Sequence, residues 1–180
     1  MNGKRRIVGS FNHGSMANAM LHAIGAQVAR PGRQVISFSG DGGFSMMMGD
    51  FISLLQLKLP VKIILLNNGT LGFVELEMKA GGFPDTGCDL KNPNFAAMAE
   101  AVGIKGIRVE KPMELEAAIR EALEHDGPAL VDVVSARQEL VMPPVTTFDE
   151  AHKFGLFMLK AVLDGRANEL IDLAKVNLLR

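Results

Sequence analysis

The sequence predicts an α/β protein with an open parallel sheet, helices on both faces of that sheet, and a C-terminal helical extension. Short β-prone runs alternate with segments of helical length, as in a parallel sheet whose strands are joined by crossover helices. Two of the runs, 61–66 (VKIILL) and 128–134 (PALVDVV), are nearly unbroken aliphatic sequence, as in strands buried on both faces. This alternation ends at Pro143–Pro144. We therefore expect an α/β domain over residues 1–142 and a helical extension of it over 143–180.

Helix breakers and turn residues separate the elements of the first half. Residues 15–28 are rich in Ala, Met and Leu, so we expect a helix there that ends before Pro31–Gly32. A β-prone run at 34–39 (QVISFS) leads through a glycine turn into 44–58, which is helical in length and apolar content. Pro60 stops that helix before the first aliphatic strand.

The second half continues the alternation. Segment 71–79 is ambiguous, and 80–93 is a polar loop that contains glycine. Asn94 is expected to cap a helix over 94–102. The remaining expected elements are a strand at 106–109, a helix at 113–125, the second aliphatic strand, and amphipathic helices at 148–163 and 168–179.

Composition limits the classes of function. A chain of 180 residues with 48% hydrophobic and 22% charged residues can form one full-sized globular domain. Its net charge of -1 gives no general attraction for nucleic acid, so we expect small-molecule or protein partners. The single cysteine, Cys88, excludes an internal disulfide and fits a reducing compartment. No apolar run approaches a bilayer span and no signal peptide opens the chain, so we expect a cytoplasmic protein.

The turn after the first expected strand has the composition of a phosphate site. Gly40, Gly42 and Gly43 surround Asp41 immediately before a helix, where small residues expose backbone N–H groups and the helix dipole favours an anion. Asp41 would repel a phosphate unless a cation lies between them. Mg2+ takes oxygen ligands from one or two side chains together with phosphate oxygens. This turn therefore predicts a metal-bridged anion site.

The turn after the next strand offers a second metal ligand. Parallel strands joined by one helix end at the same edge of a sheet, where ligands bind. The side-chain carbonyl of Asn68 is a neutral oxygen donor, and the backbone carbonyls of Gly69–Thr70 could complete the coordination shell. Asn67 is expected to serve the turn itself. If Asp41 stood alone, a helix cap would be the simpler interpretation of it, and the pairing with Asn68 favours the metal.

These motifs resemble those of a known family. A G-D-G element followed after about two dozen residues by N-N is similar to the thiamine diphosphate motif. The stretches HGSMANAM, EMKAGGF, GIRVEK and DGPALVDVV, and the ending ELIDLAKVNLLR, resemble the C-terminal third of bacterial pyruvate oxidase, the quinone-reducing pyruvate dehydrogenase. The resemblance covers essentially the whole chain.

The resemblance implies roles for residues in three segments. Those of the G-D-G turn would bind the diphosphate, those at the start of the first helix the aminopyrimidine, and those after N-N the metal, the thiazolium and the substrate. Asp41 and Asn68 would be side-chain Mg2+ ligands and Thr70 a backbone ligand; Gly40, Gly42 and Gly43 would contact the diphosphate; Gly14, Ser15 and Met16 the aminopyrimidine, with Met16 as the wedge that bends the cofactor; Leu71, Gly72 and Phe73 the thiazolium side.

The resemblance also implies a reaction and partners. The complete enzyme would use thiamine diphosphate, Mg2+ and FAD to convert pyruvate to acetate and CO2, and would pass electrons to a quinone. The glutamate that activates the cofactor belongs to a separate N-terminal domain, so no catalytic residue is assigned here and the isolated chain is expected to be inactive. No G-x-G-x-x-G flavin motif is present, which fits a separate FAD domain. Because the cofactor would lie between subunits, a homo-oligomer is implied. The alternatives are another thiamine diphosphate enzyme such as acetolactate synthase, or a stand-alone, non-catalytic cofactor-binding partner subunit.

Several other residues have simpler interpretations. We expect Met46–Met48 to fill the core of a buried helix, and His13 to be a structural, hydrogen-bonded residue. Cys88 has no Cys or His near it in sequence and is expected to be inert. The remaining interpretation covers three charged residues that alternate along one segment and that we expect to form a solvated face without a catalytic role: Glu75, Glu77 and Lys79.

The last expected helix, 168–179, has an apolar side and basic residues near its end. Docking on the domain is the simpler interpretation of such a helix. The resemblance to a peripheral membrane oxidase implies the other one, contact with lipid at the inner face of the cell membrane. The apolar side comprises Leu170, Ile171, Ala174 and Leu178, and the basic residues are Lys175 and Arg180.

Overall fold

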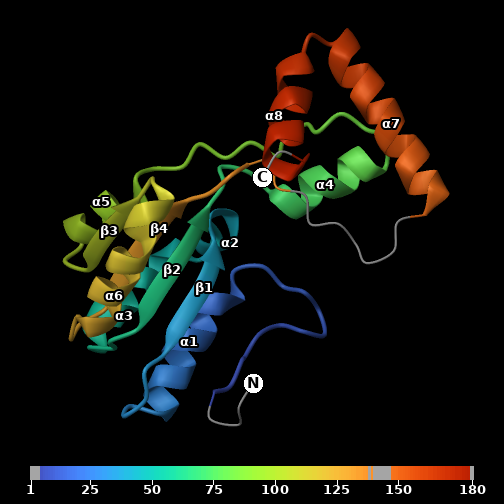
Figure 1. The fold of residues 1–180 in the computed structure, drawn as a ribbon. Coiled ribbons are helices and arrows are strands. Elements are labelled where there is room, and N and C mark those ends of the chain that lie inside the picture. Colours follow the sequence, from blue (N-terminus) through green and yellow to red (C-terminus); the bar gives the residue numbers. More distant parts are fainter. Residues whose placement is uncertain (1–4, 138, 140–146, 179–180) are drawn as a thin grey trace. The chain divides into compact units, whose positions relative to one another are not determined.

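The computed structural model describes residues 5–137, 139 and 147–178, which form two compact units (Figure 1). The sheet unit comprises Met1–Asn67 and Asn92–Ser135. The helical unit comprises Asn68–Lys91 and Ala136–Arg180. The predicted boundary between 142 and 143 lies outside the described residues and stays a prediction.

The sheet unit contains four parallel strands in the order β1-β2-β4-β3. In the register, Gly40 pairs with Leu66 of the neighbouring strand, so β1 and β2 end at the same edge, as the sequence predicted. The predicted open parallel α/β fold is confirmed. The strands are β1 (Ile36–Gly40), β2 (Lys62–Asn67), β3 (Lys105–Val109) and β4 (Ala129–Val134).

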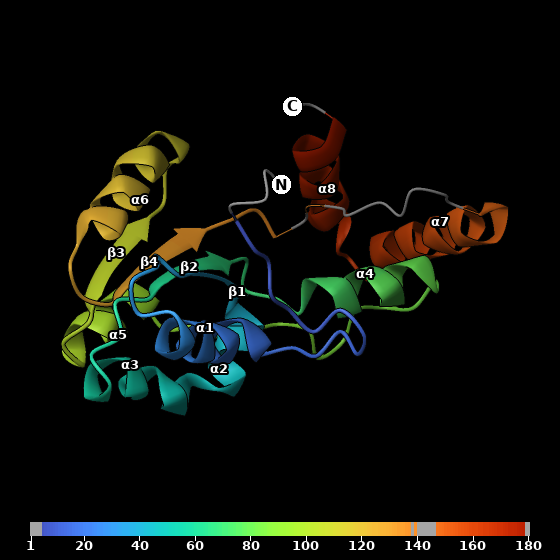
Figure 2. The ribbon, with the colours of Figure 1, turned by 90° about the horizontal axis from the view of Figure 1, so that it is seen from below.

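Helices cover both faces of this sheet (Figure 2). Side chains alternate along β2, so Ile63 and Leu65 enter one apolar core and Ile64 enters the other. The first core is completed by α1 (Asn18–Ala29), α2 (Asp41–Met46), η1 (Met48–Ile52), α3 (Ser53–Gln56) and α5 (Phe95–Ala101). The second is completed by α6 (Leu115–Glu124), which follows η2 (Pro112–Glu114).

The single helix predicted over 44–58 is wrong, because this stretch forms α2, η1 and α3. Phe44 and Phe51 both point into the core and meet edge to face, with ring centroids 5.4 Å apart. The expectation that Met46–Met48 fill the core is also wrong: these side chains are 55%, 36% and 38% exposed. The core space they were expected to fill belongs to the two phenylalanines and Leu54.

The helical unit consists of α4 (Gly72–Ala80), α7 (Phe148–Leu163) and α8 (Ala167–Leu178). The ambiguous segment 71–79 is therefore helical, and the predicted C-terminal helices are confirmed. α7 packs against both α4 and α8. Lys160 Nζ donates to the carbonyl oxygen of Gly82 at 2.7 Å, which ties α7 to the turn after α4. None of the described helices is long and apolar enough to cross a membrane.

Candidate functional site

Asp41 lies at the carboxyl edge of the sheet, as the sequence predicted. It is the first residue of α2, directly after β1, and only 3% of it is exposed. Its Oδ1 accepts a hydrogen bond from the N–H of Gly42 at 3.0 Å, and its Oδ2 accepts one from the side-chain amide of Asn92 at 2.6 Å. The carboxylate is therefore fixed in orientation by two protein donors.

Asn92 also reaches the end of the next strand. Its Nδ2 donates to Oδ1 of Asn67, the last residue of β2, at 2.9 Å. Asn67 in turn donates through Nδ2 to Oδ1 of Asp132 in β4, at 2.9 Å. Asn67 thus does more than shape the turn, because its buried side chain connects two strands through polar contacts.

Asp132 is fully buried and closes this row of polar side chains. Its Oδ2 accepts from Arg108 Nη1 at 2.7 Å and from the N–H of Phe95 at 3.2 Å. Burial of a carboxylate is costly unless it is paired and hydrogen-bonded, and both conditions are met here. We call the five side chains Asp41, Asn92, Asn67, Asp132 and Arg108 the polar row.

Three members of the polar row were not predicted from the sequence: Asn92, Asp132 and Arg108. Asn92 gave no signal, because its partners lie 51 and 25 positions away in the chain. Asp132 gave one, since a single acid within the aliphatic run PALVDVV must find a partner when the strand is buried.

The predicted aminopyrimidine segment lies against the predicted diphosphate turn. A Cβ added to Gly43 would approach the backbone nitrogen of Ala17 to 3.2 Å, so the starts of α1 and α2 lie close together. Gly14 has a φ of 57° and Ala17, which has a Cβ, a φ of 66°. A non-glycine residue in the left-handed region is uncommon and costs about 1–3 kcal/mol. Such strain is common at functional sites, and the role of this segment in binding the aminopyrimidine stays a prediction.

Further backbone contacts shape the same segment. The N–H of Gly14 donates to the carbonyl of Ser10 at 2.8 Å, and that of Ser15 donates to the Ser10 hydroxyl at 3.2 Å. Met16, the predicted wedge, is half exposed. His13 is exposed, and its predicted structural role stays a prediction.

The residues present in the sheet unit fit a Mg2+-bound diphosphate. A hard cation prefers carboxylate and amide oxygens, and Asp41 supplies a buried carboxylate. Its hydrogen bonds with Gly42 and Asn92 are compatible with coordination, because an ionised carboxylate offers about four lone-pair sites. At Gly43 a side chain would press on the backbone of Ala17, so glycine lets the two segments lie this close.

The other predicted site residues lie in the helical unit. Asn68 Oδ1 accepts the N–H of Thr70 at 3.1 Å, and Gly69 between them has a φ of 70°. Leu71 N–H donates to the carbonyl of Cys88 at 2.9 Å, and a Cβ on Gly72 would meet Asn68 Nδ2 at 3.1 Å. This loop is therefore tightly packed within its own unit.

Phe73, predicted to line the thiazolium side, is 71% exposed on the first turn of α4. Asp41 belongs to the sheet unit, whereas Asn68 and Thr70 belong to the helical unit. Joint coordination of one Mg2+ by these three residues stays a prediction.

The interpretation of Glu75 and Lys79 as a solvated face is wrong. Both are buried, and only Glu77 of the three is exposed. Lys79 Nζ lies 2.6 Å from Glu75 Oε1 and 2.7 Å from Glu169 Oε1 of α8. The i,i+4 spacing is that of an ordinary surface ion pair, and α8 converts it into a buried one.

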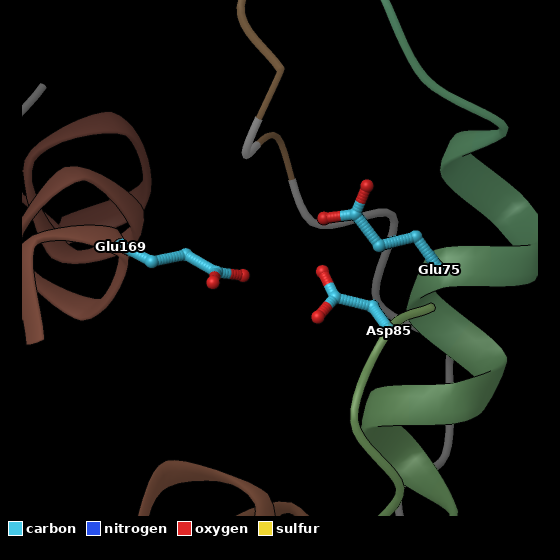
Figure 3. A group of neighbouring side chains, drawn as sticks. All are labelled: Glu75, Asp85 and Glu169. Carbon is cyan, nitrogen blue, oxygen red and sulfur yellow. The ribbon is translucent and has the colours of Figure 1, made fainter. Parts of the chain in front are cut away.

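Three carboxylates of the helical unit point towards one another from α4, from the loop after it and from α8: Glu75, Asp85 and Glu169 (Figure 3). One buried and two half-buried acids could hold a metal ion, but a protein cation already lies among them. Lys79 contacts all three, with its Nζ 3.7 Å from Asp85 Oδ2. Arg166 adds contacts with Asp85 and Glu169. We call this group the ion cluster and interpret it as structural.

The pKa shifts in the ion cluster favour the charged forms. Burial by itself would lower the pKa of Lys79, but hydrogen bonds to Glu169 and Glu75 outweigh it, so this pKa lies above the ordinary lysine value. Burial acts to raise the pKa of Asp85, but the hydrogen bond from Arg166 and the charge of Lys79 lower it below the ordinary aspartate value. Both shifts therefore favour the charged forms of Lys79 and Asp85.

The ion cluster reaches the loop that contains Thr70. The Thr70 hydroxyl donates to Glu75 Oε2 at 2.5 Å and is also 3.2 Å from the carbonyl oxygen of Cys88. Arg137 contacts both Glu75 and Asp89. An open hollow of about 520 Å³ in this unit contains none of the predicted cofactor residues; it is lined by Asp89, Ala136, Arg137, Arg166, Glu169, Asp172 and Val176.

Cys88 is buried, and burial raises the pKa of its thiol. A protonated thiol is a poor nucleophile, in agreement with the expectation that it is inert. In α8, Leu173 is buried, Ala174 is half-buried and Ile171 is exposed. Part of the helix thus packs within its own unit, and contact with lipid stays a prediction. Arg180 lies outside the described residues.

The fold and the polar row together define a class, the α/β domains that bind an anionic cofactor beyond the carboxyl ends of parallel strands. Comparison with known proteins gives the family. The family model described as "Thiamine pyrophosphate enzyme, C-terminal TPP binding domain" matches residues 1–133. The chain belongs to this family.

Individual relatives extend the similarity beyond the family domain. The Bacillus subtilis protein YdaP, described as thiamine pyrophosphate-containing, is 38% identical over 175 residues, which are 97% of this chain and 30% of that protein. The mitochondrial acetolactate synthase of Schizosaccharomyces pombe is 38% identical over 151 residues, 82% of this chain and 22% of that protein. This chain therefore spans less than a third of each relative.

A solved structure supports the same fold. The thiamine diphosphate-dependent 4-hydroxybenzoylformate decarboxylase of Rhodococcus jostii matches with a TM-score of 0.64 and 35% identity, over 68% of this chain and 24% of that chain. The named relatives include acetolactate synthases, and the pyruvate oxidase reaction stays a prediction.

Proposed function

We propose that this chain binds the diphosphate of thiamine diphosphate through Mg2+ in a larger enzyme. The observation that carries the proposal is Asp41, a buried carboxylate at the start of a helix, fixed by Gly42 and Asn92 at the sheet edge where ligands bind. A buried acid beside a phosphate needs a cation between them. Asn68, through its side chain, and Thr70, through its backbone carbonyl, are the proposed further ligands.

The other site residues would orient the cofactor. Gly40, Gly42 and Gly43 lie at the start of α2, where an anion is favoured. The segment Gly14–Met16, next to that turn, would receive the aminopyrimidine, and Leu71–Phe73 would border the thiazolium and the substrate. When bound, the cofactor supplies the carbanion chemistry, and this chain positions it and excludes water.

For the complete protein we propose a reaction of a 2-oxo acid. The names of the relatives support acetolactate synthesis in particular, because several of them are acetolactate synthases at 32–38% identity. The solved relative also acts on a 2-oxo acid, 4-hydroxybenzoylformate. Either reaction would need an activating glutamate outside this chain, so the isolated chain is proposed to be inactive and to function in a homo-oligomer with an N-terminal activating domain.

Pyruvate oxidation is the second candidate. It would produce acetate and CO2 and pass electrons through FAD to a quinone. One observation favours it: the ending ELIDLAKVNLLR resembles that of pyruvate oxidases. If this candidate is correct, α8 would also be the segment to test for contact with lipid at the cell membrane.

Product analysis separates the two reactions. The full-length protein is given pyruvate, thiamine diphosphate, Mg2+, FAD and a soluble quinone analogue. Acetolactate without quinone reduction supports the first candidate, whereas acetate formed with stoichiometric quinone reduction supports the second. If pyruvate gives neither acetolactate nor acetate, both candidates are overturned.

Calorimetry tests the metal site in the full-length protein. Asp41→Ala should weaken Mg2+-dependent binding of thiamine diphosphate by more than about tenfold, since groups that only orient metal ligands are worth about 10–100-fold. Asp50→Ala, at a half-buried carboxylate further along the same segment, is the matched control and should bind as wild type. Equal heats for Asp41→Ala and wild type would refute the assignment.

A further inference from the structure

One side chain, Asn92, joins the proposed metal ligand Asp41 to the neighbouring strand. Its single amide nitrogen donates to Asp41 Oδ2 at 2.6 Å and to Asn67 Oδ1 at 2.9 Å. An amide nitrogen carries two hydrogens, so both bonds can form at once. The three residues come from the start of α2, the end of β2 and the loop before α5, which are distant in sequence and adjacent in the sheet unit.

The direction of every hydrogen bond in the polar row follows from its chemistry. Arg108 can only donate, and it donates to Asp132 Oδ2, while Asp132 Oδ1 accepts from the Asn67 side chain. Asn67 must therefore present its Nδ2 to Asp132 and its Oδ1 to the other side, where Asn92 donates to it. The same donor nitrogen then meets Asp41. The orientation of each amide is thus dictated from one end of the row to the other.

The acceptor end of the row is rigid. Asp132 is fully buried and accepts from both Arg108 and the backbone N–H of Phe95. Asn67 is also buried and lies within a strand that is paired on both sides. Asn92 therefore links the carboxylate of Asp41 to side chains that are themselves held in place by the central strands of the sheet.

We propose that Asn92 is a positioning residue for Asp41, with Asn67 and Asp132 as its support. The inference rests on the proposed function, because it assigns Asn92 to the orientation of a Mg2+ ligand. Its two bonds fix the plane of the Asp41 carboxylate relative to the end of β2, and the next residue in the chain after β2 is Asn68, the proposed second ligand. Outer groups that orient a metal ligand typically change metal affinity by about 10–100-fold.

The test uses Asn92→Ala in the full-length protein, with Mg2+ titrated by calorimetry at saturating thiamine diphosphate. We expect the apparent Kd for Mg2+ to rise by about 10–100-fold. At saturating Mg2+, kcat for pyruvate should return to within about twofold of wild type, because the proposed role concerns metal binding only.

Asn94→Ala is the matched control. Asn94 lies two residues away in the same loop, and its Oδ1 accepts the N–H of Ala97 at 2.9 Å, which confirms it as the cap of α5. Losing this cap should lower the Tm without changing the Kd for Mg2+. A purely structural role of Asn92 would give the same pattern as this control.

Asn92→Ser covers the case in which Asn92→Ala does not fold. A serine hydroxyl donates one hydrogen bond, so it can serve Asp41 or Asn67 but not both. We expect an intermediate Kd for Mg2+ with this variant.

The outcomes separate this inference from the proposed function. If Asp41→Ala loses Mg2+ binding while the folded Asn92 variants match wild type, the positioning role is overturned and the metal site stands. If Asp41→Ala also binds like wild type, the metal site is wrong and the role of Asn92 falls with it. A weakened Kd in Asn92→Ala with an unchanged Kd in Asn94→Ala supports the proposal.

Discussion

The sheet unit and the helical unit have opposite kinds of interior. The sheet unit is built around aliphatic strands and aromatic side chains, and its polar row runs from Arg108 and Asp132 within the strands to Asp41 at the carboxyl edge. At the centre of the helical unit is a lysine, Lys79, with 2% exposure, surrounded by carboxylates. The helical unit buries fewer apolar side chains than the sheet unit, among them Phe157, Ala161 and Leu173.

The two units thus use different interactions, close packing in one and buried ion pairs in the other, to favour a single fold. Strands that are apolar on both faces must be covered by apolar side chains, so close packing determines how the elements of the sheet unit are arranged. A buried ion group is weak as a source of net stability, but it penalises any arrangement that leaves a charge unpaired. We therefore expect the sheet unit to respond to changes of side-chain volume and the helical unit to changes of charge.

The largest expected effect is that of Lys79→Met. Removing one partner of a buried ion pair costs about 3–5 kcal/mol, because the remaining charge is uncompensated. Hydrogen exchange should show loss of protection of that size for the amides of α4 and α8, with β2 and β4 unchanged. Lys175→Met is the control, since Lys175 and Asp172 are exposed at 64% each and such pairs contribute about 0–1 kcal/mol. Unchanged protection in α8 of Lys79→Met would remove the distinction between the units.

A smaller effect is expected for Gly106→Ala in β3. The added Cβ would lie 2.0 Å from the carbonyl oxygen of Ala96 in α5, so strand and helix would have to separate. Overpacking of this kind typically costs about 1–3 kcal/mol of the free energy of unfolding. Denaturant unfolding followed by exchange of the β3 and β4 amides measures it.

Gly25→Ala is the matched glycine substitution for that experiment. Gly25 lies within α1, and in the described part of the chain no atom apart from its chain neighbours and the nearby backbone of α1 lies within 4 Å of its added Cβ. Alanine should stabilise the sheet unit by about 0.5–1 kcal/mol through helix propensity. If Gly106→Ala and Gly25→Ala changed the free energy of unfolding in the same direction, close packing between β3 and α5 would not be the cause of the change in Gly106→Ala.

The smallest expected effect is a pH dependence of the helical unit. The pKa of Asp85 is lowered in the folded state, so its contribution is present above the unfolded value of about 3.9 and is lost as the pH falls through the folded value. Protection of the α4 and α8 amides should therefore decrease gradually with acid below pH 4.

Asp85→Asn should flatten this acid dependence, because it removes the titrating group. Asp172→Asn, at an exposed carboxylate on α8, is the control and should keep the slope of the wild type. An Asp85→Asn variant with the wild-type slope would show that other carboxylates carry the acid response.

Much of the fold was predictable from local pattern. The aliphatic runs at 61–66 and 128–134 became β2 and β4, and the helix expected at 148–163 has the same bounds as α7. Burial on both faces and a 3.6-residue period are properties of a short segment alone. The helix expected over 44–58 was wrong, because Met47, with a φ of -124° and a ψ of 28°, interrupts the helical backbone between α2 and η1.

The candidate site was predictable only in part, for the same reason. Asp41 was recognisable because its anomaly is local: an acid within a glycine turn before a helix. Asn92 was not recognisable, since the sequence around an asparagine in a polar loop is the same whether its side chain faces solvent or a buried carboxylate. Glu75 and Lys79 were misjudged because i,i+4 charges look alike on an exposed helix and on one covered by α8.

By itself the sequence determined the alternation of strands and helices, the family, and the turn that carries Asp41, because each depends on residues close together in the chain. The tertiary structure decided which polar side chains meet: Asn92 with Asp41 and Asn67, and Lys79 with Glu169. Hydrogen bonds and ion pairs act over about 3–4 Å of space whatever the separation in sequence. Only the folded chain brings such partners within that distance.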